Sequence, residues 1–99
     1  MDLKLIGLHL ELTPALREYV NTKFQRIAHH LESVISATVT LSIDKLIHKA
    51  YADIHIAGKP IRSEATHKDM YTAIDILIDK LNRAVLKNKE KTTHHILHH

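Results

Sequence analysis

Hydrophobic and polar residues alternate strictly over three parts of the chain. The longest run covers 34–44, and the same two-residue period returns at 51–56 and 61–66. Alternation of this kind is typical of strands that bury only one face. We therefore predict three antiparallel strands joined by two short connections, the second of them a turn at 58–60.

The N-terminal segment carries regularly spaced leucines. They are Leu3, Leu5, Leu8, Leu10 and Leu12. The phase of this pattern shifts around Gly7, which is typical of a kink or a β-bulge. We predict a single strand over 2–12, interrupted at the glycine.

Two segments show the 3.6-residue period of amphipathic helices. The first begins at Thr13, a favourable N-cap, with Pro14 at the first helical position, where proline is tolerated. The second is expected from Asp69, its N-cap, to about Lys91. The apolar stripes are Leu16, Val20, Phe24, Ile27 and Leu31 in the first helix, and Met70, Ile74, Leu77, Ile78, Leu81 and Val85 in the second.

The predicted order is β-α-β-β-β-α, an α+β fold similar to a double-stranded RNA-binding domain. Because each strand has one polar face, both helices should cover the single apolar face of a four-stranded sheet. A right-handed crossover through the first helix would leave the first two strands parallel. The open face is expected to carry Thr38, Thr40, Ser42 and Tyr51. We assign 1–92 to one domain and expect 93–99 to be a disordered, histidine-rich tail.

Length and composition agree with one self-sufficient domain. The chain has 99 residues, of which 44% are hydrophobic and 25% are charged, values in the globular range. A chain of this size buries roughly 65% of the surface that its unfolded form exposes. It has no Cys, which excludes a disulfide framework and suits the reducing cytoplasm. Residues 1–16 mix charged and apolar side chains, so we expect neither a secretion signal nor a membrane span.

Positive charge is concentrated in the second helix. The net charge is only +3, but from Lys80 onward five Lys or Arg residues stand against the single Glu90. Basic rows spaced by three and four residues are Lys80, Arg83, Lys87 and Lys91 in this helix, and Lys23, Arg26 and, with the same spacing, His30 in the first. If the helices pack side by side, both rows would flank a common groove and could bind RNA phosphates. A solvated helix exterior would show the same spacing.

Other kinds of site find less support. Base stacking on the open sheet face needs exposed aromatic residues, and only Tyr51 is expected there. With two glycines, the chain has no phosphate-cradling loop, and it lacks hydrolase and metalloprotease motifs. We expect no catalysis and no cofactor.

Histidines raise the possibility of metal binding, because the chain has ten of them. Those at the C-terminal end are His94, His95, His98 and His99. We expect adventitious transition-metal affinity there and no functional metal site, since a structural metal normally organises a fold. Asp53 and His55 form a second possible pair, which solvated polar side chains explain equally well.

Two further segments carry a family resemblance. The residues at 69–75, DMYTAID, continue through 77–83, LIDKLNR, and those at 11–20, ELTPALREYV, are followed by Lys23 and Phe24. The first resembles the second helix of the ribosome hibernation factors, the family of the ribosome-associated inhibitor and the sigma-54 modulation proteins. The second resembles the strand-to-helix entry of the same family. The similarity covers nearly all of 1–92, and the histidine-rich end departs from it.

This resemblance implies the β-α-β-β-β-α fold and a cytoplasmic protein, monomeric when free, that binds the small ribosomal subunit and its rRNA, with neither DNA nor a membrane as partner. It implies a position between head and body, where the paths of mRNA and tRNA are blocked in stationary phase or stress. The short C-terminal end is similar to short forms that promote inactive ribosome dimers. The RNA-facing positions would be Lys23, Arg26, Lys80, Arg83, Lys87, Lys89 and Lys91. The alternative is a generic double-stranded RNA-binding module without ribosome specificity.

Overall fold

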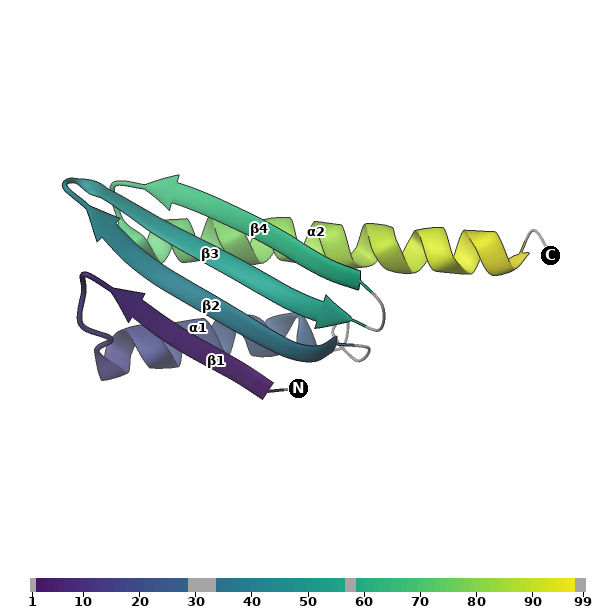
Figure 1. Ribbon diagram of the computed structural model, residues 1–99, viewed down its shortest axis with the longest axis horizontal. Coiled ribbons are helices and arrows are strands. Elements are labelled where there is room, and N and C mark those ends of the chain that lie inside the picture. Colours follow the sequence, from purple (N-terminus) through teal and green to yellow (C-terminus); the bar gives the residue numbers. More distant parts are fainter. Residues whose placement is uncertain (1, 29–33, 57–58, 98–99) are drawn as a thin grey trace.

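The computed structural model describes residues 2–28, 34–56 and 59–97, with the side chains of 59 and 88–97 excepted. Its elements follow the predicted order (Figure 1). They are β1 (Asp2–Leu8), α1 (Pro14–Arg26), β2 (Val34–Asp44), β3 (Ile47–Ile56), β4 (Lys59–His67) and α2 (Met70–Leu97).

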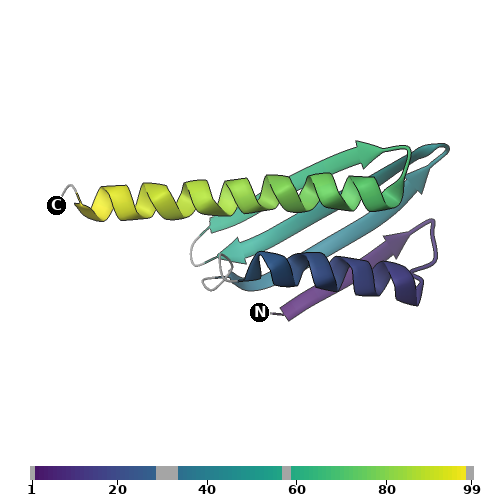
Figure 2. The same cartoon turned by 180° about the vertical axis from the view of Figure 1, so that it is seen from behind.

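The four strands form one sheet in the order β1-β2-β3-β4. β1 pairs with β2 in parallel, as the crossover through α1 requires, and the two following pairs are antiparallel. Both helices lie on the same side of the sheet, which leaves the other side open (Figures 1 and 2). The predicted fold class and the one-sided arrangement of the helices are confirmed.

The core lies between the sheet and the two helices. On β2, Val39 and Leu41 are fully buried, whereas Thr40 between them is half-buried on the open face. On α2, every residue of the predicted apolar stripe is buried. On α1 the first three are buried, as is Ile27, which follows the last residue of the helix. Leu31, the fifth position of the α1 stripe, lies outside the described residues.

The first strand is shorter than predicted. β1 ends at Leu8, and His9 adopts a left-handed backbone conformation with φ of 61°, which turns the chain away from the sheet. Leu12 then folds back over Gly7, where a Cβ atom would lie only 2.9 Å from Cγ of Leu12. The shift of phase around the glycine therefore marks the approach of the following loop, and the prediction of a strand over 2–12 was wrong beyond Leu8.

The second hairpin also differs in detail from the prediction. Lys59 and Pro60 were expected in the turn, but both belong to β4 and pair with Ile56 and His55. β4 is an edge strand, where a proline need not interrupt a hydrogen-bonded ladder. Residues 57–58 lie outside the described residues.

Both predicted N-caps are present. The hydroxyl of Thr13 accepts a hydrogen bond from the backbone N–H of Leu16 at 3.2 Å. The carboxylate of Asp69 accepts two, from the backbone N–H and the hydroxyl of Thr72, at 3.0 and 2.8 Å. These bonds hold the pKa of the Asp69 carboxyl below its usual value, because they favour the charged form.

The second helix is longer than expected, because its backbone continues past Lys91 to Leu97. No Gly or Pro interrupts the sequence after Met70, so nothing local stops the helix. Figure 2 shows that this end projects beyond the sheet. The division into a domain at 1–92 and a separate tail stays a prediction. No helix in the described part of the chain is long and apolar enough to cross a membrane.

Candidate nucleic-acid interface

The last turns of α1 place two of the predicted RNA-binding cations beside α2. Lys23 is half-buried and Arg26 is exposed, and both line a shallow groove of about 220 Å³ between the helices. Its apolar lining comes from Ile27 and Ile78. The third member of the predicted α1 row, His30, lies outside the described residues.

The α2 side of this groove is acidic and polar. Asp75, Asp79 and Asn82 line it, at helical intervals of four and three residues that put them on one face. The groove therefore brings the α1 cations to carboxylates, and not to the basic row of α2. Sequence reasoning missed this acidic face because it looked only for positive charge.

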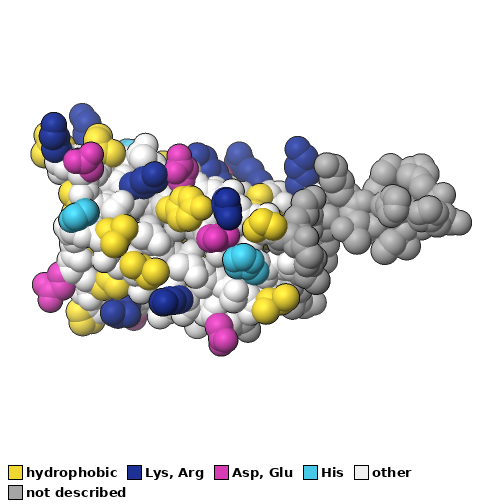
Figure 3. Space-filling view, in the orientation of Figure 1, with side chains coloured by type: hydrophobic (Ala, Val, Ile, Leu, Met, Phe, Trp, Pro, Cys, Tyr) yellow, Lys and Arg dark blue, Asp and Glu magenta, His cyan; other side chains and the backbone are white. Residues whose placement is uncertain are grey.

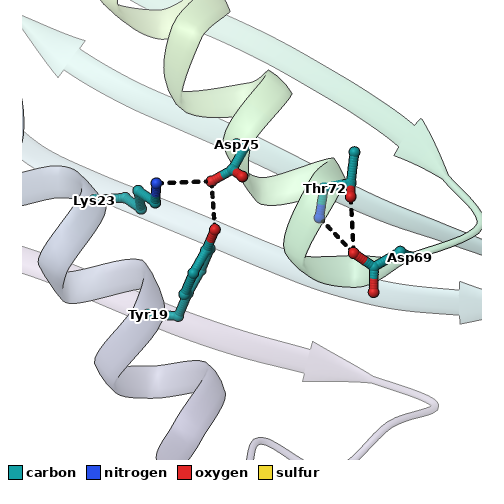
Figure 4. A network of polar contacts seen from close by, with 5 residues as sticks. All are labelled: Tyr19, Lys23, Asp69, Thr72 and Asp75. Atoms are coloured by element: carbon teal, nitrogen blue, oxygen red, sulfur yellow. Dashed lines mark hydrogen bonds and ion pairs between the residues drawn. The ribbon is translucent and has the colours of Figure 1, made fainter.

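A small polar network links the two helices at Asp75 (Figure 4). The Nζ atom of Lys23 lies 3.1 Å from Oδ1 of Asp75, and the hydroxyl of Tyr19 donates a hydrogen bond to the same oxygen at 2.7 Å. The Lys23 ammonium also lies 5.1 Å from the centre of the Tyr19 ring, within the range of a cation–π interaction. Tyr71 packs against that ring edge to face, with centroids 4.8 Å apart.

The network changes the acidity of Tyr19. Its hydrogen bond to Asp75, partial burial and the negative charge of the same carboxylate raise the pKa of Tyr19 to about 12 from 10.0. Each of these effects disfavours the tyrosinate anion. Tyr19 therefore remains a hydrogen-bond donor to Asp75 throughout the neutral range.

Lys80, the first residue of the α2 basic row, faces away from this groove. The Nζ atom of Lys80 donates a hydrogen bond to the backbone carbonyl of Glu64 on β4, at 2.9 Å. Asp75 and Lys80 are five residues apart, which corresponds to about 140° around a helix axis. One faces α1 and the other faces β4, so Lys80 lies outside this groove, whereas Arg83 pairs with Asp79 at its edge. That the two basic rows together bind RNA stays a prediction.

Arg83 and Lys87 of α2 are well exposed. Arg83 pairs with Asp79 at 3.1 Å across one helical turn, with 78% of the Arg83 side chain accessible. Within the described side chains, neither Arg26 nor Lys87 has an ion-pair partner. The backbone of α2 includes Lys89 and Lys91, and their side chains lie outside the described part of the structure.

The open face of the sheet has mixed charge (Figure 3). Lys49 pairs with Glu64 at 3.0 Å, and Arg62 lies 3.7 Å from Asp53. His55 lies 3.8 Å from the other oxygen of Asp53. Cations and carboxylates thus neutralise each other across neighbouring strands, and among the described side chains this face presents no patch of a single charge sign.

Metal-binding side chains do not converge in the described part of the chain. It contains no group of three or more His, Cys, Asp or Glu residues placed to hold a metal ion. The side chains of the C-terminal histidines lie outside the described residues.

The sequence matches the profile of one protein family over almost its full length. Residues 3–93 match the family described as sigma 54 modulation protein / S30EA ribosomal protein. The chain belongs to this family of ribosome-associated factors. This agrees with the resemblance found in the two sequence segments.

Individual relatives show which proteins of this family are similar to the chain in sequence. The chain is 41% identical to a ribosome hibernation promoting factor of Azotobacter vinelandii over 91 residues, which cover 92% of this chain and 85% of the relative. It is 39% identical to the protein of the same name from Escherichia coli strain K12, over 96% of this chain and all of the relative. The homologues are thus ribosome hibernation promoting factors.

A solved structure supports the same assignment. A ribosomal subunit interface protein from Coxiella burnetii superposes on the chain with a TM-score of 0.87 at 29% sequence identity. The superposition covers 91% of this chain and 99% of the other. The fold of the chain is therefore that of a ribosome-associated protein.

Proposed function

We propose that this protein silences idle ribosomes by binding small-subunit rRNA between head and body. The observation that carries the proposal is the similarity of nearly the whole chain to ribosome hibernation promoting factors. A protein bound there blocks the paths of mRNA and tRNA during stationary phase or stress. It acts in the cytoplasm, is monomeric when free and catalyses no reaction.

The exposed cations support an RNA partner. Arg26 and Lys87 can neutralise phosphates directly, and each such contact releases a counterion condensed on the RNA. Arg83 can exchange Asp79 for a phosphate at little cost, because an exposed ion pair contributes only about 0.2–1 kcal/mol. Lys80 is exposed too, and it can exchange the backbone carbonyl of Glu64 for a phosphate. Lys23, Lys89 and Lys91 complete the proposed set.

Charge reversal on α2 tests the RNA contact. Arg83→Glu combined with Lys87→Glu should abolish cosedimentation with small subunits at physiological salt, because the new carboxylates repel the phosphate backbone. Thermal stability should change little, since both positions are exposed. The matched control, Lys4→Glu with Arg62→Glu, changes the net charge equally on the open sheet face and should still cosediment. A folded Arg83/Lys87 variant that cosediments normally would mean that these cations are merely solvated surface.

A generic double-stranded RNA-binding module would use the same cations, so ribosome specificity needs its own test. Excess unlabelled RNA duplex should displace the protein poorly from small subunits if the ribosome is the target. Equal competition by duplex and subunits, compared at equal phosphate concentration, would favour the generic module.

We also propose that the protein promotes inactive ribosome dimers. Purified protein added to vacant ribosomes should shift them toward the dimer peak of a sucrose gradient. Ribosomes that carry the protein but stay monomeric would instead assign it inhibition without dimerisation.

A further inference from the structure

Asp75 occupies a position that the proposed RNA contact does not explain. Its carboxylate lies in the groove between α1 and α2 and binds Lys23, one of the cations proposed to meet RNA. A carboxylate at such a surface repels phosphates. We propose that Asp75 determines specificity for the RNA target. It is an internal counter-ion for Lys23, and an RNA phosphate can bind this lysine only by replacing the carboxylate as its partner. The inference rests on the proposed function.

The geometry allows such an exchange. An ammonium group has three donors and binds carboxylate and phosphate oxygens alike. The Asp75 side chain is 45% accessible and that of Lys23 is 21% accessible, so the pair is open to solvent on the Asp75 side. Ion pairs that are open to solvent are weak, and forming one changes an equilibrium constant only a few-fold. A phosphate can therefore compete with the Asp75 carboxylate for Lys23.

Tyr19 keeps the carboxylate in place. Its hydroxyl holds Oδ1 of Asp75 at 2.7 Å, and its ring is supported edge to face by Tyr71. The negative charge therefore stays in the groove when Lys23 turns toward a phosphate. Binding of an RNA that presents only phosphates there is opposed twice. The ion pair between Lys23 and Asp75 is broken, and the carboxylate that remains repels the phosphates.

An RNA that places a hydrogen-bond donor beside the Asp75 carboxylate binds with less of this unfavourable free energy. Base amino groups and the 2′-hydroxyl can donate to a carboxylate, whereas phosphate oxygens cannot. Asp75 thus acts against non-target RNA, which is the repulsive element that specific recognition often needs. A purely structural role in tying α1 to α2 would have the opposite consequence, because losing it would weaken all RNA binding.

Asp75→Asn separates the two roles. It removes the charge but keeps an amide oxygen that can accept the Tyr19 hydrogen bond. For a fluorescent RNA hairpin of about 16 base pairs, we expect a several-fold gain in affinity and a log–log salt slope steeper by about one unit. Affinity for purified small subunits should rise less, so the ratio between the two targets should fall. The matched control, Asp44→Asn, removes the same charge on the hairpin between β2 and β3 and should leave that ratio unchanged.

Two further variants make the test decisive. In a Lys23→Ala background, Asp75→Asn should steepen the salt slope much less, because no cation is left to be freed. Tyr19→Phe should not increase hairpin binding to the same extent, since it leaves the ion pair intact. Hairpin binding by Asp75→Asn that matches Asp44→Asn, or that is weaker than that of the wild type, would overturn the inference. Failure of the wild type to bind small subunits would overturn the proposed function, while the hairpin titrations would still decide whether Asp75 competes for Lys23.

Discussion

The hydroxyl of Tyr19 on α1 lies 2.7 Å from Oδ1 of Asp75 on α2, and this hydrogen bond joins residues 56 positions apart in the chain. It links two helices whose apolar faces share one hydrophobic core with the sheet. The bond requires a protonated tyrosine, so it makes the contact between the helices sensitive to high pH.

A tyrosine titration should reveal this bond. The pKa of Tyr19 is raised to about 12 from 10.0, so its contribution to stability is fully present below pH 10 and is lost as the pH rises toward 12. The difference in the free energy of unfolding between the wild type and Tyr19→Phe, about 1 kcal/mol at neutral pH, should shrink over that interval. Ultraviolet absorbance should show a tyrosine step near pH 12 that Asp75→Ala moves downward. Tyr51→Phe, on the open sheet face, should leave that step in place.

Acid should weaken the N-cap of α2. The pKa of Asp69 is lowered from 3.8 by hydrogen bonds from Thr72, so its contribution is present above that pH and is lost as the pH falls through the lowered value. Asn caps helices without titrating, so the stability of the wild type relative to Asp69→Asn should fall below about pH 4. Thr72→Ala should move this loss to higher pH. Parallel pH curves for the wild type and Asp69→Asn in urea denaturation would contradict the prediction.

Gly7→Ala should destabilise the protein, although alanine is usually more favourable than glycine inside a strand. The new Cβ would lie 2.9 Å from Cγ of Leu12, closer than such atoms pack, and 3.0 Å from the carbonyl oxygen of Leu10, which is also tight. We expect a loss of about 1–3 kcal/mol in the free energy of unfolding, the usual effect of overpacking. In a Leu12→Ala background the same change should cost less, which a double-mutant cycle measures. Equal costs in the two backgrounds would show that Leu12 is not the obstacle.

The salt dependence of binding to small subunits should show how many phosphates the protein contacts. If Lys23, Arg26, Lys80, Arg83 and Lys87 each neutralise about one phosphate, binding to small subunits should weaken with salt at a log–log slope of roughly −4. Arg26→Ala and Lys87→Ala should each flatten the slope by about one unit, because both side chains are exposed and free to reach RNA. Lys4→Ala on the open sheet face provides the control and should leave the slope unchanged. Unchanged slopes for both helix variants would remove these residues from the interface.

Local geometry explains how much of the fold the sequence predicts. Alternation at 34–44 identifies the buried side of β2 because side chains on a strand point to opposite faces in turn. Thr13 and Asp69 are recognisable as caps because their hydrogen-bond partners lie three residues away. The end of β1 escapes this reasoning, since it depends on Leu12 returning over Gly7.

The basic rows show where sequence reasoning about the candidate site ends. Spacing alone identifies Lys80, Arg83 and Lys87 as neighbours on one helix. The resemblance to the ribosome hibernation factors implies that these three positions face RNA. Only the tertiary structure decides how α2 is rotated about its axis. Burial of its apolar stripe against the sheet turns Asp75 toward α1 and Lys80 toward β4. Periodicity describes one helix at a time, whereas the groove and its charge depend on which faces of two helices, far apart in the chain, meet when both cover the same sheet.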